Sequence, residues 1–289
     1  MALTSLIPKI WAARFLDNLN NALVYGRAIS RDYQADAQYG DSIEIAKFGD
    51  VAVGDYVKNT DFSTGPETLD ATAMTLLINQ QKYFNFQIDS IDEAQTKPNL
   101  MNKAMERAAY AMATEVDGYL SGLYNGFTNT IGAVATPVTP DVDDIYGYLT
   151  SAAEKLDEAN APVNGRYLIM NAAGIKLLKD SGVYLSDTIN GDTVRYQGQF
   201  AATRSLPMGY KGTVAGFDLY FSNQTPSSGT STSIWTAGHS MGIQMVDSLN
   251  EVVGYTPELR FAEAVKGLYV YGAKITQPTA GVKIFTTLG

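Results

Sequence analysis

The N-terminal segment carries a helical pattern of apolar positions. Between residues 7 and 24 an apolar side chain recurs at every fourth position, and polar or charged residues fill most of the positions between them. This spacing predicts an amphipathic helix over 7–24. A helix so close to the chain end needs a second surface for its apolar stripe, and we expect that surface to contact Trp11, Phe15 and Leu19.

Two segments further along alternate apolar and polar residues with the period of a β-strand. They span residues 41–58 and 73–89, and the polar stretch between them contains a Gly-Pro turn at 65–66. Together they predict a two-stranded excursion of about fifty residues. An isolated two-stranded ribbon is only marginally stable, so we expect it to pack on a surface outside its own domain.

Residues 98–123 predict a long helix. Pro98 suits the first helical turn, and apolar side chains then recur every three or four residues from Leu100 to Leu123. At 1.5 Å per residue such a helix is roughly 35–40 Å long. Its stripe of alanine, methionine and leucine is typical of core packing. The stretch 125–141 that follows is rich in glycine, threonine and proline and predicts a connector.

The second half of the chain alternates expected helices and strands. Helices are expected over 141–160 and 172–180, and a long polar loop over 186–200. No glycine-rich turn joins a strand to a helix as in dinucleotide-binding folds, so the pattern predicts no cofactor. Strands are expected over 166–171, 212–223, 232–237, 242–246 and 266–276.

Composition narrows the possible functions. The chain has 289 residues, of which 45% are hydrophobic and 18% charged, as is typical of a globular protein with a sizeable core. It contains no cysteine, which excludes disulfides, thiolate zinc sites and cysteine nucleophiles. Its net charge of -9 disfavours nucleic-acid binding as the main function, because such binding neutralises phosphates with Lys and Arg. Without a membrane-spanning run or a signal peptide, we expect the chain to stay in a cytoplasm.

The strongest catalytic signal is the run Gly238-His239-Ser240-Met241-Gly242, which fits the G-x-S-x-G motif of serine hydrolases. A hydrolase triad needs a histidine base, and His239 is the only histidine in the chain. It directly precedes Ser240 and so cannot readily act as its base. The residues after the motif alternate like a strand, whereas the hydrolase motif leads into a helix. We interpret the motif as a turn between strands and keep a hydrolase that uses Ser240 as a remote alternative.

Three acids, Asp141, Asp143 and Asp144, lie at the start of an expected helix. Acidic side chains in a first helical turn are explained by capping and by the helix dipole. A hard cation would need further oxygen ligands, which the neighbouring sequence does not supply. With one histidine and no cysteine in addition, the sequence predicts no metal site.

The order of these parts resembles the major capsid proteins of tailed bacteriophages, which have the Hong Kong 97-type fold. The segments IPKIWAARFLDNLNNALVYGRAISRDYQADAQYGDSIEI and PELRFAEAVKGLYVYGAKITQP are similar to parts of many phage coat proteins. The central segments RYLIMNAAGIKLLKD and VAGFDLYFSNQTP are similar to parts of the same family. The likeness covers nearly the whole chain and rests on the order of apolar and turn patterns, without a catalytic motif.

The resemblance implies an α+β fold of the Hong Kong 97 type. Its parts are an N-terminal arm, an extended β-hairpin loop that reaches over a neighbouring subunit, a peripheral domain with a long spine helix, and a mixed α/β axial domain. In this chain the arm would be residues 1–38, the extended loop 39–90, the peripheral domain 91–140 with 236–289, and the axial domain 141–235.

The resemblance also implies a function without catalysis. The chain would be a major capsid protein whose copies assemble as pentamers and hexamers into the icosahedral shell of a virion. That shell would enclose phage double-stranded DNA without sequence-specific binding, cofactor or membrane, and it would form in the cytoplasm of a bacterial host. Expected partners are a portal protein, a decoration protein and, because no long charged helical leader precedes the arm, a separate scaffolding protein. The alternative is the shell of an encapsulin-like cellular compartment.

The residues expected to contact neighbouring subunits lie in the arm and the extended loop. Some relatives join a loop lysine covalently to a neighbour's asparagine, for which Lys58 and Asn250 are the candidates here. That chemistry also needs a buried carboxylate and a shielded site, and the simpler expectation is an ordinary intersubunit salt bridge from Lys58. The expected contact residues are Trp11, Phe15, Leu19, Tyr56, Lys58 and Phe62.

Overall fold

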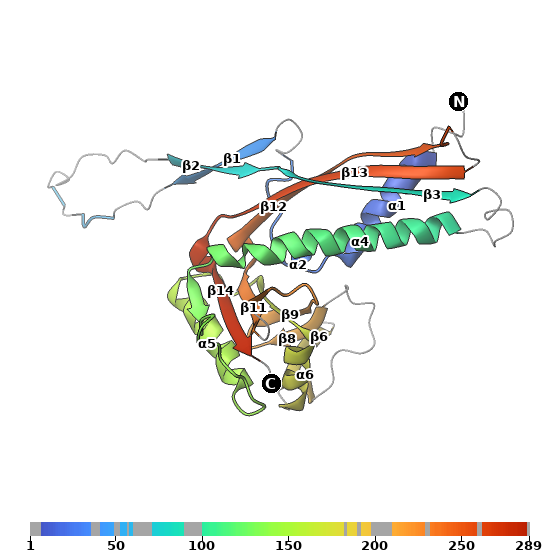
Figure 1. Ribbon diagram of the computed structural model, residues 1–289. Helices are drawn as coiled ribbons and strands as arrows, with labels where there is room; N and C mark the ends of the chain where they lie inside the picture. The colour runs from blue at the N-terminus through green and yellow to red at the C-terminus, as the bar shows by residue number, and fades with distance from the viewer. Residues whose placement is uncertain are drawn as a thin grey trace.

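The chain forms two stacked bodies and one long projection (Figure 1). The small body is a three-stranded sheet with two helices against it, the large body is a wider sheet with two helices in its core, and the projection is a two-stranded hairpin. The computed structural model describes residues 7–35, 41–48, 53–56, 58–59, 71–89, 100–181, 184–189, 192–197, 210–228, 232–258 and 262–287.

The sheet of the small body is antiparallel throughout and has the strand order β12–β13–β3. Alternate side chains of β13, among them Val265, Tyr269 and Tyr271, are fully buried on the helix side of the sheet. The opposite side chains form the outer face, which points away from the helices. The strands are β3 (Gln80–Asp89), β12 (Ile243–Tyr255) and β13 (Ala262–Ile275).

Two helices predicted from the apolar spacing are confirmed. The first is α1 (Ile7–Ala22), which is followed by the single-turn helix α2 (Tyr25–Ala28). The second is α4 (Leu100–Gly122), whose 23 residues make it about 35 Å long. The apolar side of α4 packs into the core of the small body, as expected, with Met105, Ala109, Met112, Val116 and Leu120 all buried.

The projection is a hairpin of β1 (Ser42–Phe48) and β2 (Ala71–Leu77), paired antiparallel. Its root packs on the outer face of the small sheet, where Val246 of β12 is fully buried beneath it. From there the hairpin extends well beyond both bodies (Figure 1). The buried side chains of the root are Ile43, Ile45, Leu76 and Ile78.

The pattern over 73–89 predicts a single strand, and the structure divides it in two. The first part, β2, pairs with β1, and the second, β3, pairs with β13. Between them the chain crosses directly over Gly272, where a Cβ atom would lie 2.2 Å from the carbonyl oxygen of Leu77. Alternation continues through this crossing while the pairing partner changes, so the pattern alone does not reveal the division.

The large body is a nine-stranded sheet with the order β4–β14–β11–β5–β9–β8–β6–β7, and β10 pairs with β11 beside that path. Helices α5 (Ile145–Glu158) and α6 (Ala172–Asp180) contribute buried leucines and isoleucines to its core, around Trp235. The strands are β4 (Asn129–Ile131), β5 (Arg166–Met170), β6 (Tyr184–Ile189), β7 (Asp192–Gln197), β8 (Tyr210–Val214), β9 (Phe217–Phe221), β10 (Ser227–Ser228), β11 (Thr232–His239) and β14 (Gly281–Thr287).

Three sequence expectations for the large body need correction. The polar loop expected over 186–200 contains part of a hairpin, β6–β7, because polar residues alternate there on paired strands. The strand expected over 212–223 is two strands joined by a tight turn, in which Ala215 and Gly216 have φ of 49° and 80°. The strand β14 was not expected, and its pairing with β11 puts residues 281–287 in this sheet although the range 236–289 is expected in the peripheral domain.

Candidate assembly site

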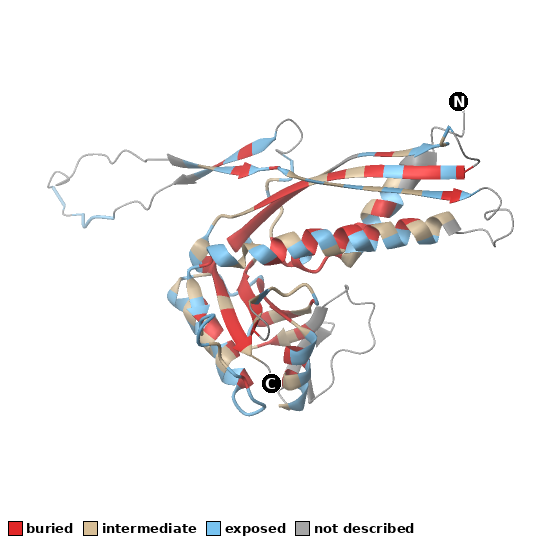
Figure 2. Cartoon of the chain, in the orientation of Figure 1, coloured by how far each residue is buried: buried red, intermediate tan, exposed pale blue. Residues whose placement is uncertain are grey.

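Among the described residues of the hairpin, the buried side chains lie at its root (Figure 2). Beyond its root, Val53 is 96% and Tyr56 is 70% exposed, and Lys58 is exposed as well. Phe62, the third expected contact residue of this segment, lies outside the described residues. An aliphatic and an aromatic side chain on a projection far from the body are available for contact with a second molecule.

The arm helix differs from the expectation that its stripe is covered by a neighbour. Phe15 and Leu19 are fully buried in the core of their own small body. The ring of Phe15 stacks on Phe84 of β3, with ring centres 4.7 Å apart. In this conformation neither side chain has surface left for another subunit. Trp11 belongs to α1, and its side chain lies outside the described residues.

The outer face of the small sheet is covered only in part. The hairpin root lies over Val246 and Val270 at one end. Beyond the root a hollow of about 480 Å³ opens over Leu268 and Tyr83, and Tyr83 is 79% exposed. The outer face therefore offers apolar and aromatic surface directly beside the place where the chain's own hairpin already packs.

Polar side chains order the far end of this outer face. The hydroxyl of Tyr255 donates a hydrogen bond to Oδ1 of Asn85 over 3.0 Å. The ammonium of Lys266 lies 5.3 Å from the centre of the Tyr255 ring, within the range of a cation–π contact. These contacts connect the end of β12 to β13 and β3. They hold the side chains of Tyr255, Lys266 and Asn85 in defined positions on the outer face.

The arm is joined to the body by a buried carboxylate, Asp117 of α4. Its Oδ2 accepts a hydrogen bond from the backbone N–H of Val24 at 2.8 Å, and its Oδ1 accepts from Tyr25 at 3.0 Å and Gly26 at 3.3 Å. The side chain is 4% exposed, and burial raises the pKa of Asp117 to about 6. The three hydrogen bonds and the charge of Arg31 oppose that rise without cancelling it.

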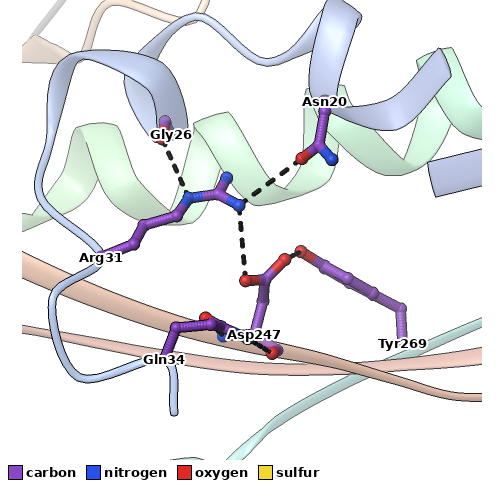
Figure 3. Close-up of polar contacts among 6 residues, drawn as sticks. All are labelled: Asn20, Gly26, Arg31, Gln34, Asp247 and Tyr269. Carbon is purple, nitrogen blue, oxygen red and sulfur yellow. Dashed lines mark hydrogen bonds and ion pairs between the residues drawn. The ribbon is translucent and has the colours of Figure 1, made fainter. Parts of the chain in front are cut away.

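A second carboxylate, Asp247 of β12, holds the chain just beyond α2 (Figure 3). Arg31 forms an ion pair of 3.4 Å with Asp247 and donates a further hydrogen bond of 3.3 Å to the carbonyl of Gly26. The hydroxyl of Tyr269 donates to the other oxygen of Asp247, and burial raises the pKa of that tyrosine. The cluster fixes residues 26–31 against the small sheet.

Residues 30–34, which we call the strap, cover part of the open edge of β12. The N–H of Ser30 donates to the carbonyl of Ser240, and the N–H of Met245 donates to the carbonyl of Ser30. Further along, the side-chain amide of Gln34 bonds both the N–H and the carbonyl of Asp247, as a neighbouring strand would. The strap thereby protects an edge that would otherwise be free to pair with another chain.

Sequence reasoning found none of these polar contacts between arm and body. Asp117 lies more than ninety residues from the amides it binds, and Asp247 lies 216 residues from Arg31. No local motif marks either carboxylate. The one available signal was an aspartate inside the apolar stripe of a helix predicted to be core, since a charge at such a position needs partners.

The hydrolase-like motif is a turn, as the sequence interpretation predicts. β11 ends at His239, a single 3-10 turn spans Ser240–Gly242, and β12 begins at Ile243. Both ring nitrogens of His239 are engaged, with Nε2 2.7 Å from the carbonyl of Asn164 and Nδ1 accepting from the N–H of Met241. The histidine therefore has no nitrogen to offer the hydroxyl of Ser240.

Among the described residues, no group of three or more His, Asp and Glu side chains could hold a metal ion. In that same part of the chain, no helix is long and apolar enough to cross a membrane.

The family model described as phage capsid protein matches residues 71–284, which is most of the chain. The chain belongs to the phage capsid protein family. A search of curated proteins found no significant match.

Three solved structures show how the capsid protein compares with other shells. One from Mycobacterium phage Che8 is 26% identical, with a TM-score of 0.68, over 91% of this chain and 90% of the other. The capsid of cyanophage P-SCSP1u is 16% identical, with a TM-score of 0.62, over 87% and 85%. A virus-like particle from Pyrococcus furiosus is 12% identical, with a TM-score of 0.59, over 96% and 99%. The last two likenesses concern the fold alone.

The expected α+β fold and the expected function are thereby confirmed. The capsid protein is a major shell protein of a bacteriophage, it forms the shell from copies of itself, and it is a component of the virion. Its family and its structural neighbours are structural proteins.

Proposed function

We propose that the hairpin of one subunit lies on the outer face of the next subunit's small sheet, and that this contact closes the subunits into pentamers and hexamers. The observation that carries the proposal is the hairpin itself, which extends beyond its own body with Tyr56 70% exposed. A contact between two different surfaces is heterologous, and heterologous contacts form rings when the rotation between copies closes. The hairpin residues assigned to it are Tyr56, Lys58 and Phe62.

The surface of the neighbouring subunit that would bind the hairpin can be inferred from the place where the root of the chain's own hairpin packs. Its root already covers the outer face at Val246 and Val270, and the hollow over Leu268 and Tyr83 continues the same surface. A neighbour's hairpin placed there would extend an existing layer and bury apolar area, which stabilises by roughly 25 cal/mol per Å². Of the arm residues we retain Trp11 as a contact, because Phe15 and Leu19 are buried within their own chain.

We assign the parts of the subunit as an arm of residues 1–38, an extended loop of 39–90, and peripheral and axial domains. The peripheral domain includes 91–140 and the strands β12 and β13, and the axial domain includes 141–235. Strand pairing favours adding 129–131, 236–239 and 281–287 to the axial unit, since β4, β11 and β14 are part of the large sheet, and it favours adding 80–89 to the peripheral unit, since β3 is part of the small sheet.

The assembled shell would enclose double-stranded DNA without reading its sequence, in keeping with a net charge of -9. We expect it to form in the host cytoplasm with a portal protein and a separate scaffolding protein, and to accept a decoration protein. Co-expression with the products of neighbouring genes, followed by purification of shells, identifies these partners as stoichiometric components.

We assign the subunit no catalytic activity. His239 is held by two backbone groups, so Ser240 lacks a base. A fluorophosphonate probe should leave Ser240 unlabelled, and stoichiometric labelling of that residue would establish the hydrolase alternative.

A cellular compartment shell is the second candidate, favoured by the likeness to the virus-like particle from Pyrococcus furiosus. The contents of native particles separate the two functions. Genome-length DNA in the particles supports the phage shell, whereas a packaged enzyme in place of DNA would support the compartment.

The hairpin contact can be tested by crosslinking, because the chain has no native cysteine. One chain carries Tyr56→Cys, a second carries Tyr83→Cys, and mixed shells are treated with a short bismaleimide. Covalent dimers are expected in shells and absent from free subunits. The matched control pairs Tyr56→Cys with Tyr146→Cys, an exposed tyrosine of α5. Dimers in the control mixture alone would place the hairpin elsewhere and contradict the proposal.

A further inference from the structure

The two outer strands of the small sheet differ in how their free edges are covered. The edge of β12 is covered in part by the strap, whose Ser30 and Gln34 bond to its backbone. Among the strands that the structure describes, β3 pairs with β13 alone. In an antiparallel pair, every second residue of an edge strand directs its N–H and C=O away from its neighbour. These groups make β3 a template for a further strand.

α4 runs alongside β3 (Figure 1), and a groove of about 950 Å³ lies between them. On the strand side it is lined by residues 83–88, among them two phenylalanine rings that pack on the core of the small body. On the helix side the small side chains of Ala104 and Ala108 leave the groove open. Next to one end of the groove, an ion pair of 2.9 Å between Lys82 and Glu115 joins β3 to α4.

Two cations line the groove on its helix side. Lys103 and Arg107 are both exposed and lie one helical turn apart. Among the described residues, neither of them forms an ion pair. The acids Asp89 and Glu106 of the same two elements do not line the groove. The groove is therefore positively charged in a chain whose net charge is -9.

The spacing of the two cations matches the repeat of a β-strand. Four residues of a helix rise by about 6 Å, so Lys103 and Arg107 are separated by about that distance along α4. Alternate residues of a strand point to the same side and are about 7 Å apart. A strand laid along residues 83–88, over about 20 Å, can therefore direct acidic side chains at alternate positions toward the two cations in turn.

We propose that the groove between β3 and α4 binds an extended acidic segment of a second protein, which pairs with the edge of β3 and directs alternate acidic side chains toward Lys103 and Arg107. Main-chain hydrogen bonds to the strand edge supply affinity, and the cations select an acidic sequence. The inference does not rest on the proposed hairpin contact, which uses the outer face of the sheet, away from α4.

Two other occupants fit the groove less well. Pairing of β3 with β3 of a second copy would bring the cations of both copies to one side of the joined sheet, where they repel. A nucleic acid would meet the cations, but it has no peptide groups with which to continue a sheet.

Peptide binding to free subunits tests the proposal. A fluorescent heptapeptide that alternates glutamate and valine should bind with a dissociation constant below about 1 mM, and a heptapeptide that alternates lysine and valine should not. The double variant Lys103→Glu with Arg107→Glu should weaken binding by at least about tenfold. The matched control, Lys176→Glu with Lys179→Glu, makes the same charge change at exposed positions of α6 and should leave binding unchanged.

Hydrogen exchange shows where the peptide binds. The bound glutamate peptide should protect amides among residues 83–88 of β3, and it should not protect β7, which is an edge strand of the large sheet. Absence of binding up to about 1 mM, equal binding of the lysine peptide, or equal affinity in the two double variants would overturn the proposal.

The same measurements identify the other occupants. Protection of the amides of residues 83–88 in shells assembled from purified subunits alone would assign the groove to a second copy of the chain. Displacement of the peptide by a short oligothymidine would assign the cations to nucleic acid. Either result would overturn the proposal, whereas the crosslink between hairpin and outer face is measured separately and can succeed or fail by itself.

Discussion

The arm helix and the hairpin both extend from the small body, and both have apolar side chains that a monomer must place somewhere. The apolar side chains of the two segments differ in burial. Phe15 and Leu19 of α1 are fully buried in their own chain, whereas Tyr56 and Val53 of the hairpin are 70% and 96% exposed. The arm helix therefore contributes to the stability of its own subunit, whereas these two side chains of the hairpin are exposed to solvent, in keeping with the proposed contact between subunits.

An apolar stripe near a chain end therefore does not by itself show which surface covers it. α1 lies beside α4 and β12, and its apolar side chains pack with theirs in one hydrophobic core. The hairpin has a core only at its root, where Leu76 and Ile78 pack on Val246. The apolar composition of a segment therefore does not show whether it packs in its own chain, as α1 does, or remains exposed, as the end of the hairpin does.

The largest expected effect is the loss of shells when the hairpin is shortened. Deleting residues 56–68 removes the end of the hairpin and leaves its buried root intact. The subunit should fold with an unchanged thermal midpoint and form no closed shells, as judged by circular dichroism and electron microscopy. A deletion variant that is unfolded as a monomer would show that this segment serves its own chain.

A truncation in the arm should have the converse effect. Phe15→Ala removes a buried ring that stacks on Phe84, and it should lower the free energy of unfolding by about 3–5 kcal/mol. Denaturant unfolding of dispersed subunits measures this change.

Tyr56→Ala is the matched control on the hairpin. It should change the free energy of unfolding by less than about 0.5 kcal/mol while raising the subunit concentration needed for assembly. An equal loss of subunit stability in both variants would remove the contrast between arm and hairpin.

The crossing of the hairpin root over Gly272 predicts a smaller effect. Gly272→Ala puts a methyl group 2.2 Å from the carbonyl oxygen of Leu77, so the root must lift from the sheet. We expect a loss of about 1–3 kcal/mol in subunit stability, together with slower assembly, because the hairpin leaves the body at a changed angle. Gly122→Ala, at a helical glycine with open space around it, is the control and should be nearly neutral.

Lys58 has the smallest expected effect. As one partner of an exposed intersubunit salt bridge it contributes about 0–1 kcal/mol, so Lys58→Ala should weaken assembly only slightly, and more at low salt than at high salt. Shells boiled in detergent should give monomers alone on a gel. A ladder of covalent oligomers that disappears in Lys58→Ala would instead establish the crosslink to an asparagine such as Asn250.

Much of the fold follows from periodicity in the sequence. The long helix α4 and the arm helix α1 are determined by local spacing, and the spacing is visible without any partner. The division of 73–89 is not visible, because it depends on where the chain crosses Gly272, nearly two hundred residues away. The strand β14 was missed for a related reason, since its place is set by pairing with β11.

The candidate site was less accessible to sequence reasoning than the fold. The resemblance of the whole chain to a family predicts Tyr56 and Lys58 as contact residues, and both are exposed, while their contact with a neighbour stays a prediction. The buried carboxylates Asp117 and Asp247 were not found, because each is explained only by backbone or side-chain groups brought to it by folding. Apolar residues can be read directly from the sequence, whereas the burial of a carboxylate can be recognised only once the groups that surround it in the fold are known.

Electron cryomicroscopy of assembled shells, at a resolution that traces side chains, tests the contrast between arm and hairpin most directly. We expect Phe15 to remain against Phe84 of its own chain while Tyr56 lies on the outer face of the neighbouring subunit, near that subunit's hollow over Leu268 and Tyr83. Shells in which α1 packs into a neighbour's core, or in which the hairpin contacts only its own chain, would contradict it.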